Sequence, residues 1–430
     1  MEAIQKRLSL ITFSSIYLIF FLLLFFIIEG THLNISNADF ILDFDLSPFS
    51  IFVAIIYCLS FALSLFPTKE HENLRPQFLS LFFLGLGIIF SNTIFTFFVF
   101  WSFHRLIPFI HFLKNFDENS GRKAGSYILA HVVGFSLFLY LVFQSYEMNL
   151  LTTSLRNYPT TFFTFPHLII LIFISFMSQG IFPLHQWGTD LISSFSWQEV
   201  STFLISRSGI ILFYKMIIPG LSSRPISFQL AIMIITIISS IYWISMAMIE
   251  KNIHKAIGMF YLSQASLIIT GLQAGPVGVK GALIQMVVIS FASTTMWSIT
   301  HYLDREFKLN SQTSFHGLAR YTPRLAFVFI MMAFSVIALP LGLGFASEDL
   351  LVHALLEHAH WLGLFHILAA CLNGIFIYQL FGKIFLGTPK NDIPQANFDL
   401  PYRRLIPYYL IIVFFLGTGL FPQWIIGILP

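Results

Sequence analysis

Apolar segments that are long enough to cross a lipid bilayer recur along the whole chain. The hydrocarbon core of a bilayer requires about 20 apolar residues per helix, and by this criterion we expect about 13 spans. They fall near 8–28, 49–66, 77–91, 93–112, 125–146, 163–187, 197–217, 227–248, 253–273, 280–302, 322–348, 360–386 and 405–428. Only 10% of the residues are charged, which excludes an ordinary soluble domain. The sequence therefore predicts an all-α polytopic membrane protein.

Basic residues are distributed unevenly between alternate loops. The loops that share a side with the N-terminus carry 17 Lys and Arg residues, whereas the opposite loops carry only Arg156, Arg224 and Lys280. Cytoplasmic loops are enriched in Lys and Arg, so we expect a multi-pass protein of the cell (inner) membrane with its N-terminus in the cytoplasm and its C-terminus outside. The small net charge of +3 gives no indication of a nucleic-acid partner, and membrane lipid is the expected surrounding.

Two of the expected spans are interrupted by helix breakers. The sixth span contains Gly180 and Pro183, and the eleventh contains Pro340, Gly342 and Gly344. Such breaks are tolerated at membrane depth only against protein or a water-filled cavity. We therefore expect both spans to be discontinuous.

The two interrupted spans are five helices apart and so run in opposite directions. Broken helices at matching places in two halves are typical of inverted-repeat transporters. We expect two inverted five-helix repeats, within 93–217 and 218–358, with N-terminal helices at 1–92 and C-terminal helices at 359–430.

Charged residues inside spans are costly and indicate candidate sites. Glu199 and Arg207 are eight residues apart in the seventh span, which would place them near one helix face about two turns apart. That separation is too large for a direct pair, so each needs a polar partner from another helix. The alternative is a purely structural buried ion pair with a neighbouring helix.

Further candidates for an ion pathway lie in the fourth and eleventh spans. His104 and Arg105 are in mid-span, with snorkelling of Arg105 to the nearer interface as the alternative. Glu348 and Asp349 directly follow the second break, where exposed backbone groups favour charge. His185 follows the first break; we expect it to fix the broken helix by hydrogen bonding, with a proton relay as the alternative.

No cofactor or metal motif is present. The histidines of HALLEHAH, from His353 to His360, match neither H-E-x-x-H nor H-x-x-E-H, so we expect an interfacial helix end. Cys58 and Cys371 lie in apolar runs without metal-ligand spacing. We also find no haem, flavin, nucleotide or quinone motif, and no constellation for an enzyme.

Six motifs occur in an order that resembles a known family. They are DLSPFS at 45–50, RKAGSYILAH at 122–131, PLHQW at 183–187 with Asp190, KNIHKAIGMFYLSQASLIITGL at 251–272, GFASEDLL at 344–351 and FFLGTGLFPQWI at 414–425. The family comprises the antiporter-like membrane subunits of respiratory complex I and the Mrp-type cation/proton antiporters.

The resemblance implies a mechanism in which ionisable residues near the midplane hand protons along a hydrated path. Three family positions for ionisable residues are serines here, namely Ser102, Ser178 and Ser293. The position that keeps an ionisable residue is Glu348, so a full proton relay is not expected.

The resemblance thus implies a membrane subunit that couples a proton or sodium gradient to work done by a partner. A short chain without the usual relay best suits the branch that accumulates inorganic carbon (CO2 or bicarbonate) with a large soluble zinc protein resembling a carbonic anhydrase, on the cytoplasmic face. The alternative is a relay-deficient scaffold subunit of a respiratory or antiporter-type complex.

Overall fold

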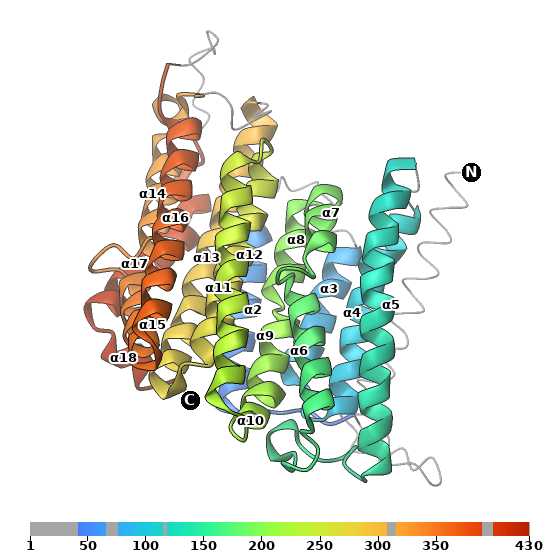
Figure 1. Ribbon diagram of the computed structural model, residues 1–430. Helices are drawn as coiled ribbons and strands as arrows, with labels where there is room; N and C mark the ends of the chain where they lie inside the picture. The colour runs from blue at the N-terminus through green and yellow to red at the C-terminus, as the bar shows by residue number, and fades with distance from the viewer. Residues whose placement is uncertain (1–41, 66–75, 115–117, 308–314, 389–398, 430) are drawn as a thin grey trace.

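Helices run side by side through the part of the chain that the computed structural model describes, which is residues 42–65, 76–114, 118–307, 315–388 and 399–429 (Figure 1). The helices are α2 (Pro48–Leu65), α3 (Pro76–Phe90), α4 (Ile94–Lys114), α5 (Glu118–Glu147), α6 (Phe165–Gln179), α7 (Gln186–Ser194), α8 (Trp197–Ile205), α9 (Ser208–Leu212), α10 (Ile218–Leu221), α11 (Ile226–Ile249), α12 (Ile253–Leu272), α13 (Gly275–Phe307), α14 (Pro323–Val336), α15 (Leu343–His358), α16 (His360–Phe385), α17 (Tyr402–Leu420) and α18 (Gln423–Ile426). Short helical turns, η1 (Leu155–Asn157), η2 (Phe213–Ile217) and η3 (Leu318–Arg320), complete the described elements.

The helices confirm the all-α polytopic class. Within the described ranges, eight helical segments are long and apolar enough to cross a membrane, when the consecutive helices of Trp197–Leu221 are taken as one segment. Three shorter apolar helices accompany them. From the second expected span onward, each expected span coincides with a helix or with a set of consecutive helices. The first expected span, near 8–28, lies outside the described residues.

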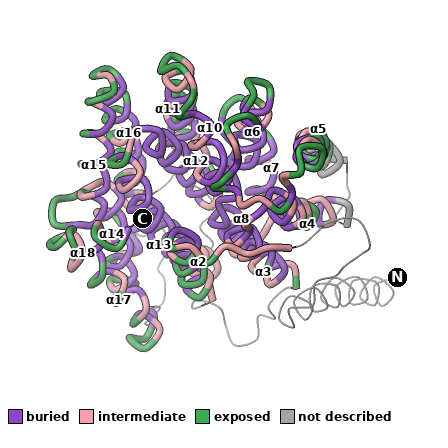
Figure 2. The backbone as a smooth tube through the Cα atoms, turned by 90° about the horizontal axis from the view of Figure 1, so that it is seen from below, coloured by how far each residue is buried: buried purple, intermediate pink, exposed green. Residues whose placement is uncertain are grey.

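The centre of the bundle is formed by α12 and α13, and the outer helices keep one exposed face (Figure 2). The 18-residue apolar window of α13 is completely buried, whereas only 22% of the equivalent window of α17 is buried. A helix that is apolar on all sides belongs in a protein interior, and α13 occupies such a position. The polar residues that α13 carries therefore face other helices rather than lipid.

Both expected helix breaks are confirmed. α6 ends at Gln179, Gly180 adopts a left-handed conformation with φ of 70°, and the chain turns through a cis Phe182–Pro183 bond before α7. α14 ends at Val336 and α15 starts at Leu343, so the second break separates two helices as well.

A third break, between α8 and α9, was not expected from the sequence. The seventh span is divided after α8, because Arg207 takes a left-handed conformation with φ of 49° and ψ of 36°. The following η2 segment is π-helical. Neither glycine nor proline occupies the left-handed position itself, and the Arg207 side chain holds that position through contacts with other helices. Glu199 and Arg207 consequently do not share the face of one continuous helix.

The second break depends on close backbone contact at Gly344. A Cβ atom at this position would overlap the main-chain carbonyl of Ser335 in α14. Glycine is thus required where the start of α15 lies against the end of α14.

We predict that Gly344→Ala lowers the free energy of unfolding by about 1–3 kcal/mol or more, because neither backbone can move without disturbing the break. Thermal unfolding of the detergent-purified chain measures this. Gly417→Ala is the matched control, since a Cβ there meets no atom within 4 Å. Equal unfolding temperatures for the two variants would contradict the prediction.

Candidate ion-pathway site

A buried carboxylate lies directly after the second helix break. Glu348 of α15 is only 7% exposed. Its Oε2 lies 2.8 Å from His366 Nε2 of α16, and its Oε1 accepts a hydrogen bond of 3.2 Å from Gln285 Nε2 of α13. Three helices therefore hold this carboxylate, and both of its oxygens have a partner.

The hydrogen bonds continue beyond the carboxylate. Gln285 Nε2 also donates to Gln264 Oε1 of α12 over 2.7 Å, and Ser347 Oγ donates to Gln285 Oε1 over 2.8 Å. Carboxylates and imidazoles are the side-chain types that most often serve as general acids and bases. This arrangement is chemically suited to proton exchange.

Two members of this cluster were not singled out from the sequence. They are His366, which contacts Glu348, and Gln285, which donates to it. A signal was available, because α15 and α16 are joined at Ala359 and form a hairpin. Antiparallel helices of such a hairpin bring residues at similar distances from the turn together.

The other acidic and histidine candidates of α15 lie outside this cluster. Asp349 is exposed, so the structure does not bring it together with Glu348. His353 Nε2 and Glu357 Oε1 form an ion pair of 3.2 Å with both side chains mostly exposed. This fits the expected exposed helix end of the HALLEHAH segment.

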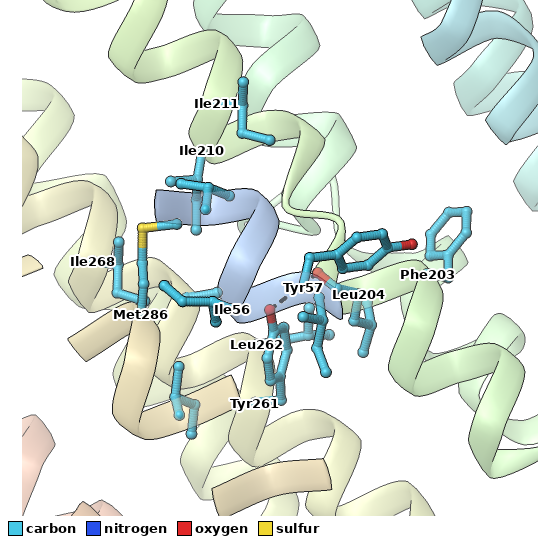
Figure 3. Packing of buried hydrophobic residues seen from close by; sticks show 14 of the residues in the cluster. Ile56, Tyr57, Phe203, Leu204, Ile210, Ile211, Tyr261, Leu262, Ile268 and Met286 are labelled. Atoms are coloured by element: carbon cyan, nitrogen blue, oxygen red, sulfur yellow. Dashed lines mark hydrogen bonds between the residues drawn. The ribbon is translucent and has the colours of Figure 1, made fainter. Parts of the chain in front are cut away.

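Arg207 joins the third break to the centre of the bundle. Its side chain is buried, its Nε donates to Tyr261 Oη of α12 over 3.0 Å, and its Nη2 donates to Met286 O over 2.8 Å and to Ser290 Oγ of α13. Tyr261 Oη in turn donates to Leu204 O, a carbonyl at the end of α8 (Figure 3). The expected polar partners from other helices are confirmed for Arg207.

Glu199 takes part in a capping box at the start of α8. Its Oε2 accepts hydrogen bonds from the Ser196 backbone N at 3.0 Å and from Ser196 Oγ at 2.8 Å, and the Ser196 hydroxyl caps the Glu199 N–H in return. This is a capping box, whose S-x-x-E pattern is visible in the sequence. Because the third break makes α8 a short separate helix, its first turn needs such a cap.

Arg105 is buried rather than snorkelling to an interface, so that alternative is wrong. Its Nη2 donates to Ser178 O over 3.1 Å and to Ser208 Oγ. Its guanidinium lies over three aromatic rings, at 5.9 Å from Trp101, 5.5 Å from Trp187 and 4.4 Å from Phe203.

The serines at the family's ionisable positions fall into two places. Ser102 and Ser178 lie beside Arg105, and Ser178 Oγ accepts a hydrogen bond of 2.9 Å from Trp101. Ser293 lies on α13, where its hydroxyl donates to Ile289 O of its own helix.

The two remaining histidine candidates differ in their surroundings. His104 is completely buried and stacks on Phe203 at a ring separation of 4.7 Å. His185 Nε2 lies 2.8 Å from Tyr242 Oη, and His185 Nδ1 lies 3.1 Å from Pro183 O. His185 thus fixes the segment after the first break, as expected.

Adjacent residues link these groups into a row. Ser208 contacts Arg105 and directly follows Arg207 in the chain. Gln285 contacts Glu348 and directly precedes Met286, whose carbonyl accepts a hydrogen bond from Arg207. Polar contacts therefore extend from α4 through the third break and α13 to α16. The row is cationic at Arg105 and Arg207 and anionic at Glu348.

A second ionic cluster ties the start of α2 to η2. Asp45 precedes α2, outside the spanning segments, and its Oδ2 lies 3.2 Å from Lys215 Nζ. Lys215 Nζ also donates to Ile89 O and Ser91 O. Burial alone would raise the pKa of Asp45, but hydrogen bonds from Ser47 and Ser50 and the Lys215 ammonium outweigh it and lower the pKa to about 2.

We predict that this cluster loses its stabilising effect in acid. A carboxylate whose pKa is lower in the folded state than in the unfolded state stabilises the fold above its unfolded pKa, and the stabilisation is lost as pH falls toward the folded pKa. Asp45→Asn should therefore lower the unfolding temperature at neutral pH, and its difference from wild type should shrink between about pH 4 and pH 2. The exposed Asp349→Asn is the control. A difference that is independent of pH would contradict the prediction.

We also predict that Arg207→Lys lowers the free energy of unfolding by about 1–3 kcal/mol, because one ammonium cannot replace donors that reach α12 and α13 from separate nitrogens. Chemical unfolding in detergent measures this. Arg156→Lys makes the same chemical change at a side chain that is 41% exposed. Equal losses in the two variants would show that the Arg207 contacts contribute no stability.

Comparisons with known proteins agree with this architecture. The family described as NADH:quinone oxidoreductase/Mrp antiporter, TM, matches residues 91–373, which is more than half of the chain. Chain 4 of the chloroplastic NAD(P)H-quinone oxidoreductase of Crucihimalaya wallichii is 21% identical over 394 residues, covering 85% of this chain and 77% of the relative. Subunit M of the NADH-quinone oxidoreductase of Rickettsia prowazekii is 23% identical over 303 residues, covering 68% and 60%.

Solved structures show the same fold. A chain of respiratory complex I from Thermus thermophilus superposes with a TM-score of 0.79 at 18% identity, covering 90% of this chain and 84% of that chain. A chain of the Mrp complex from Dietzia sp. superposes with a TM-score of 0.75 at 15% identity, covering 89% and 82%. The chain therefore belongs to the family of multi-pass, antiporter-like membrane subunits found in NADH:quinone oxidoreductases and Mrp antiporters.

Proposed function

We propose that this chain is a subunit that couples a proton or sodium gradient to work done by a partner, and that Glu348 and His366 carry its protonatable step. The observation that carries the proposal is the buried Glu348–His366 contact of 2.8 Å, immediately after a helix break. Ionisable residues that face the interior of a helical membrane bundle mark ion pathways and proton relays. His366 supplies a second proton-binding group, which the loss of the family's other ionisable positions makes necessary.

The first half of the chain supports only a partial relay. An arginine guanidinium is not deprotonated in proteins, so Arg105 holds a fixed charge instead of exchanging a proton. The hydroxyls of Ser102 and Ser178 do not titrate either. We therefore assign proton exchange to the second half, and we assign to Arg105 and Arg207 a fixed electrostatic field.

The membrane arrangement that fits this proposal has about 13 spans, with the N-terminus in the cytoplasm and the C-terminus outside. In it, residues 93–217 and 218–358 form the two inverted repeats. The breaks at 180–185 and 337–342 then lie in the two repeats.

The relatives named above are parts of multi-subunit complexes by their titles, and we propose that this chain also works with a partner. The more specific proposal is the membrane subunit of an inorganic-carbon accumulation complex with a soluble zinc protein on the cytoplasmic face. It rests on the family resemblance and on the reduced relay. A neighbouring gene for a large zinc protein would support it, whereas a set of redox subunits would favour a respiratory complex.

We predict that Glu348→Gln lowers gradient-dependent activity at least about tenfold, because the amide keeps the size of the side chain and removes its proton exchange. The measurement is ion flux or partner activity after reconstitution with the partner. Glu357→Gln is the matched control, since Glu357 lies on the same helix and is 65% exposed. His366→Gln should cause a comparable loss.

Equal activity of wild type and Glu348→Gln would exclude Glu348 as a carrier and favour the scaffold alternative. Complex assembly is measured in parallel by size-exclusion chromatography. A loss of activity with normal assembly in both the Glu348→Gln and the His366→Gln variant supports the relay, because a purely structural pair would change assembly or stability first.

A further inference from the structure

A groove of about 460 Å³ lies between α4 and α5, away from the Glu348 cluster. Its walls are apolar and consist mainly of Phe98, Phe103, Leu106, Phe109, Val132 and Phe135. Several of these residues are exposed at the rim, with Val132 57%, Phe103 44% and Phe135 41% exposed. In a membrane, this opening faces the hydrocarbon phase or a neighbouring helix.

Polar residues form the deep side of the groove, and their hydrogen bonding is incomplete. Arg105, Ser102 and His131 line it together with Tyr127. Within the part of the chain that the structure describes, Arg105 Nε and Nη1, Ser102 Oγ and His131 Nε2 are buried without a hydrogen-bond partner. Buried polar groups in proteins nearly always have a hydrogen-bond partner. Several buried donors and acceptors without a partner at one place therefore indicate a bound molecule.

The charge of Arg105 indicates what kind of molecule binds. The contacts described for its guanidinium are with neutral oxygens and with aromatic rings, and no carboxylate oxygen of the described residues lies within ion-pair distance. A buried cation without a counter-ion is strongly unfavourable, and an anion that accepts hydrogen bonds would satisfy Nε and Nη1. Ser102 Oγ is a further donor for the same group.

The shape of the groove limits the anion to one that arrives from lipid. Arg105 is 11 residues from the first residue of α4 and nine from the last, which corresponds to about 16 Å and about 14 Å along the helix axis. A free inorganic ion would have to cross the aromatic and aliphatic walls, whereas an amphiphile places its hydrocarbon chain against them. A small head group fits such a depth better than a phosphodiester does.

We propose that the groove between α4 and α5 binds a long-chain carboxylate, with its carboxylate at Arg105 and Ser102 and its hydrocarbon chain along the wall of phenylalanines. The site is independent of the Glu348–His366 pair and does not rest on the proposed coupling function. The bound carboxylate would take the place of an acidic side chain, which Ser102 does not provide.

Brominated stearic acid tests this proposal, because bromine quenches tryptophan fluorescence at short range and Trp101 lies at the groove. The full-length chain in neutral phosphatidylcholine nanodiscs is titrated at alkaline pH with the brominated acid, with brominated stearyl alcohol and with brominated phosphatidylglycerol. The acid should bind at least about tenfold more tightly than the alcohol, since only the acid pairs with Arg105. Trp101→Phe should reduce the amplitude of quenching.

Two variants locate the site. Arg105→Gln should remove the preference for the acid, whereas Arg156→Gln, which changes an exposed arginine in the same way, should retain it. Val132→Phe narrows the groove from its exposed wall without altering any polar group, so it should weaken acid binding even if Arg105→Gln fails to fold.

Equal binding of acid and alcohol overturns the proposal, as does binding of the acid that is not weakened in Val132→Phe. Binding of phosphatidylglycerol but not of the fatty acid overturns the assignment of a carboxylate head group. Acid binding that is weakened in Val132→Phe, together with loss of the preference over the alcohol in Arg105→Gln where this variant folds, supports it.

Discussion

The contacts of Arg207 tie the break between α8 and α9 to the two central helices of the bundle, α12 and α13. Arg207 lies at this break in a left-handed conformation, which costs about 1–3 kcal/mol for a residue with a side chain. Hydrogen bonds to α12 and α13 hold it there, and Tyr261 ties the same break to Leu204. An interrupted span is stable in a membrane only when other helices satisfy the groups that the break releases. The central helices provide those partners.

The polar interior that results is electrostatically unequal. Its first half contains Arg105 among serines and aromatic rings, and its second half contains Glu348 with His366 and two glutamines. One side therefore holds an arginine guanidinium, and the other holds a carboxylate in contact with an imidazole.

The surroundings of Ser102 in the structure suggest a role that its place in the sequence does not. As a sequence position, it marks the loss of an acidic group. In the structure it lies beside a buried arginine and a groove whose polar groups lack partners. Because Ser102 carries no acidic group, Arg105 has no carboxylate partner there, and this is the basis of the proposed anion site.

The sequence by itself determined the all-α membrane class, the positions of the spans and the breaks at Gly180 and Pro340, because these follow from apolar length and from local backbone chemistry. It also identified Glu348 and Arg207 as buried charges, since charge within an apolar segment is visible directly. Only the tertiary structure decided the third break, because Arg207 leaves the helical conformation for contacts with residues that are 54 to 83 positions away in the chain. The partnership of His366 with Glu348 and the unsatisfied hydrogen-bonding groups around Arg105 were likewise decided by which helices pack together. Packing between distant segments is not encoded in any local pattern, so it became readable only when the helices were in place.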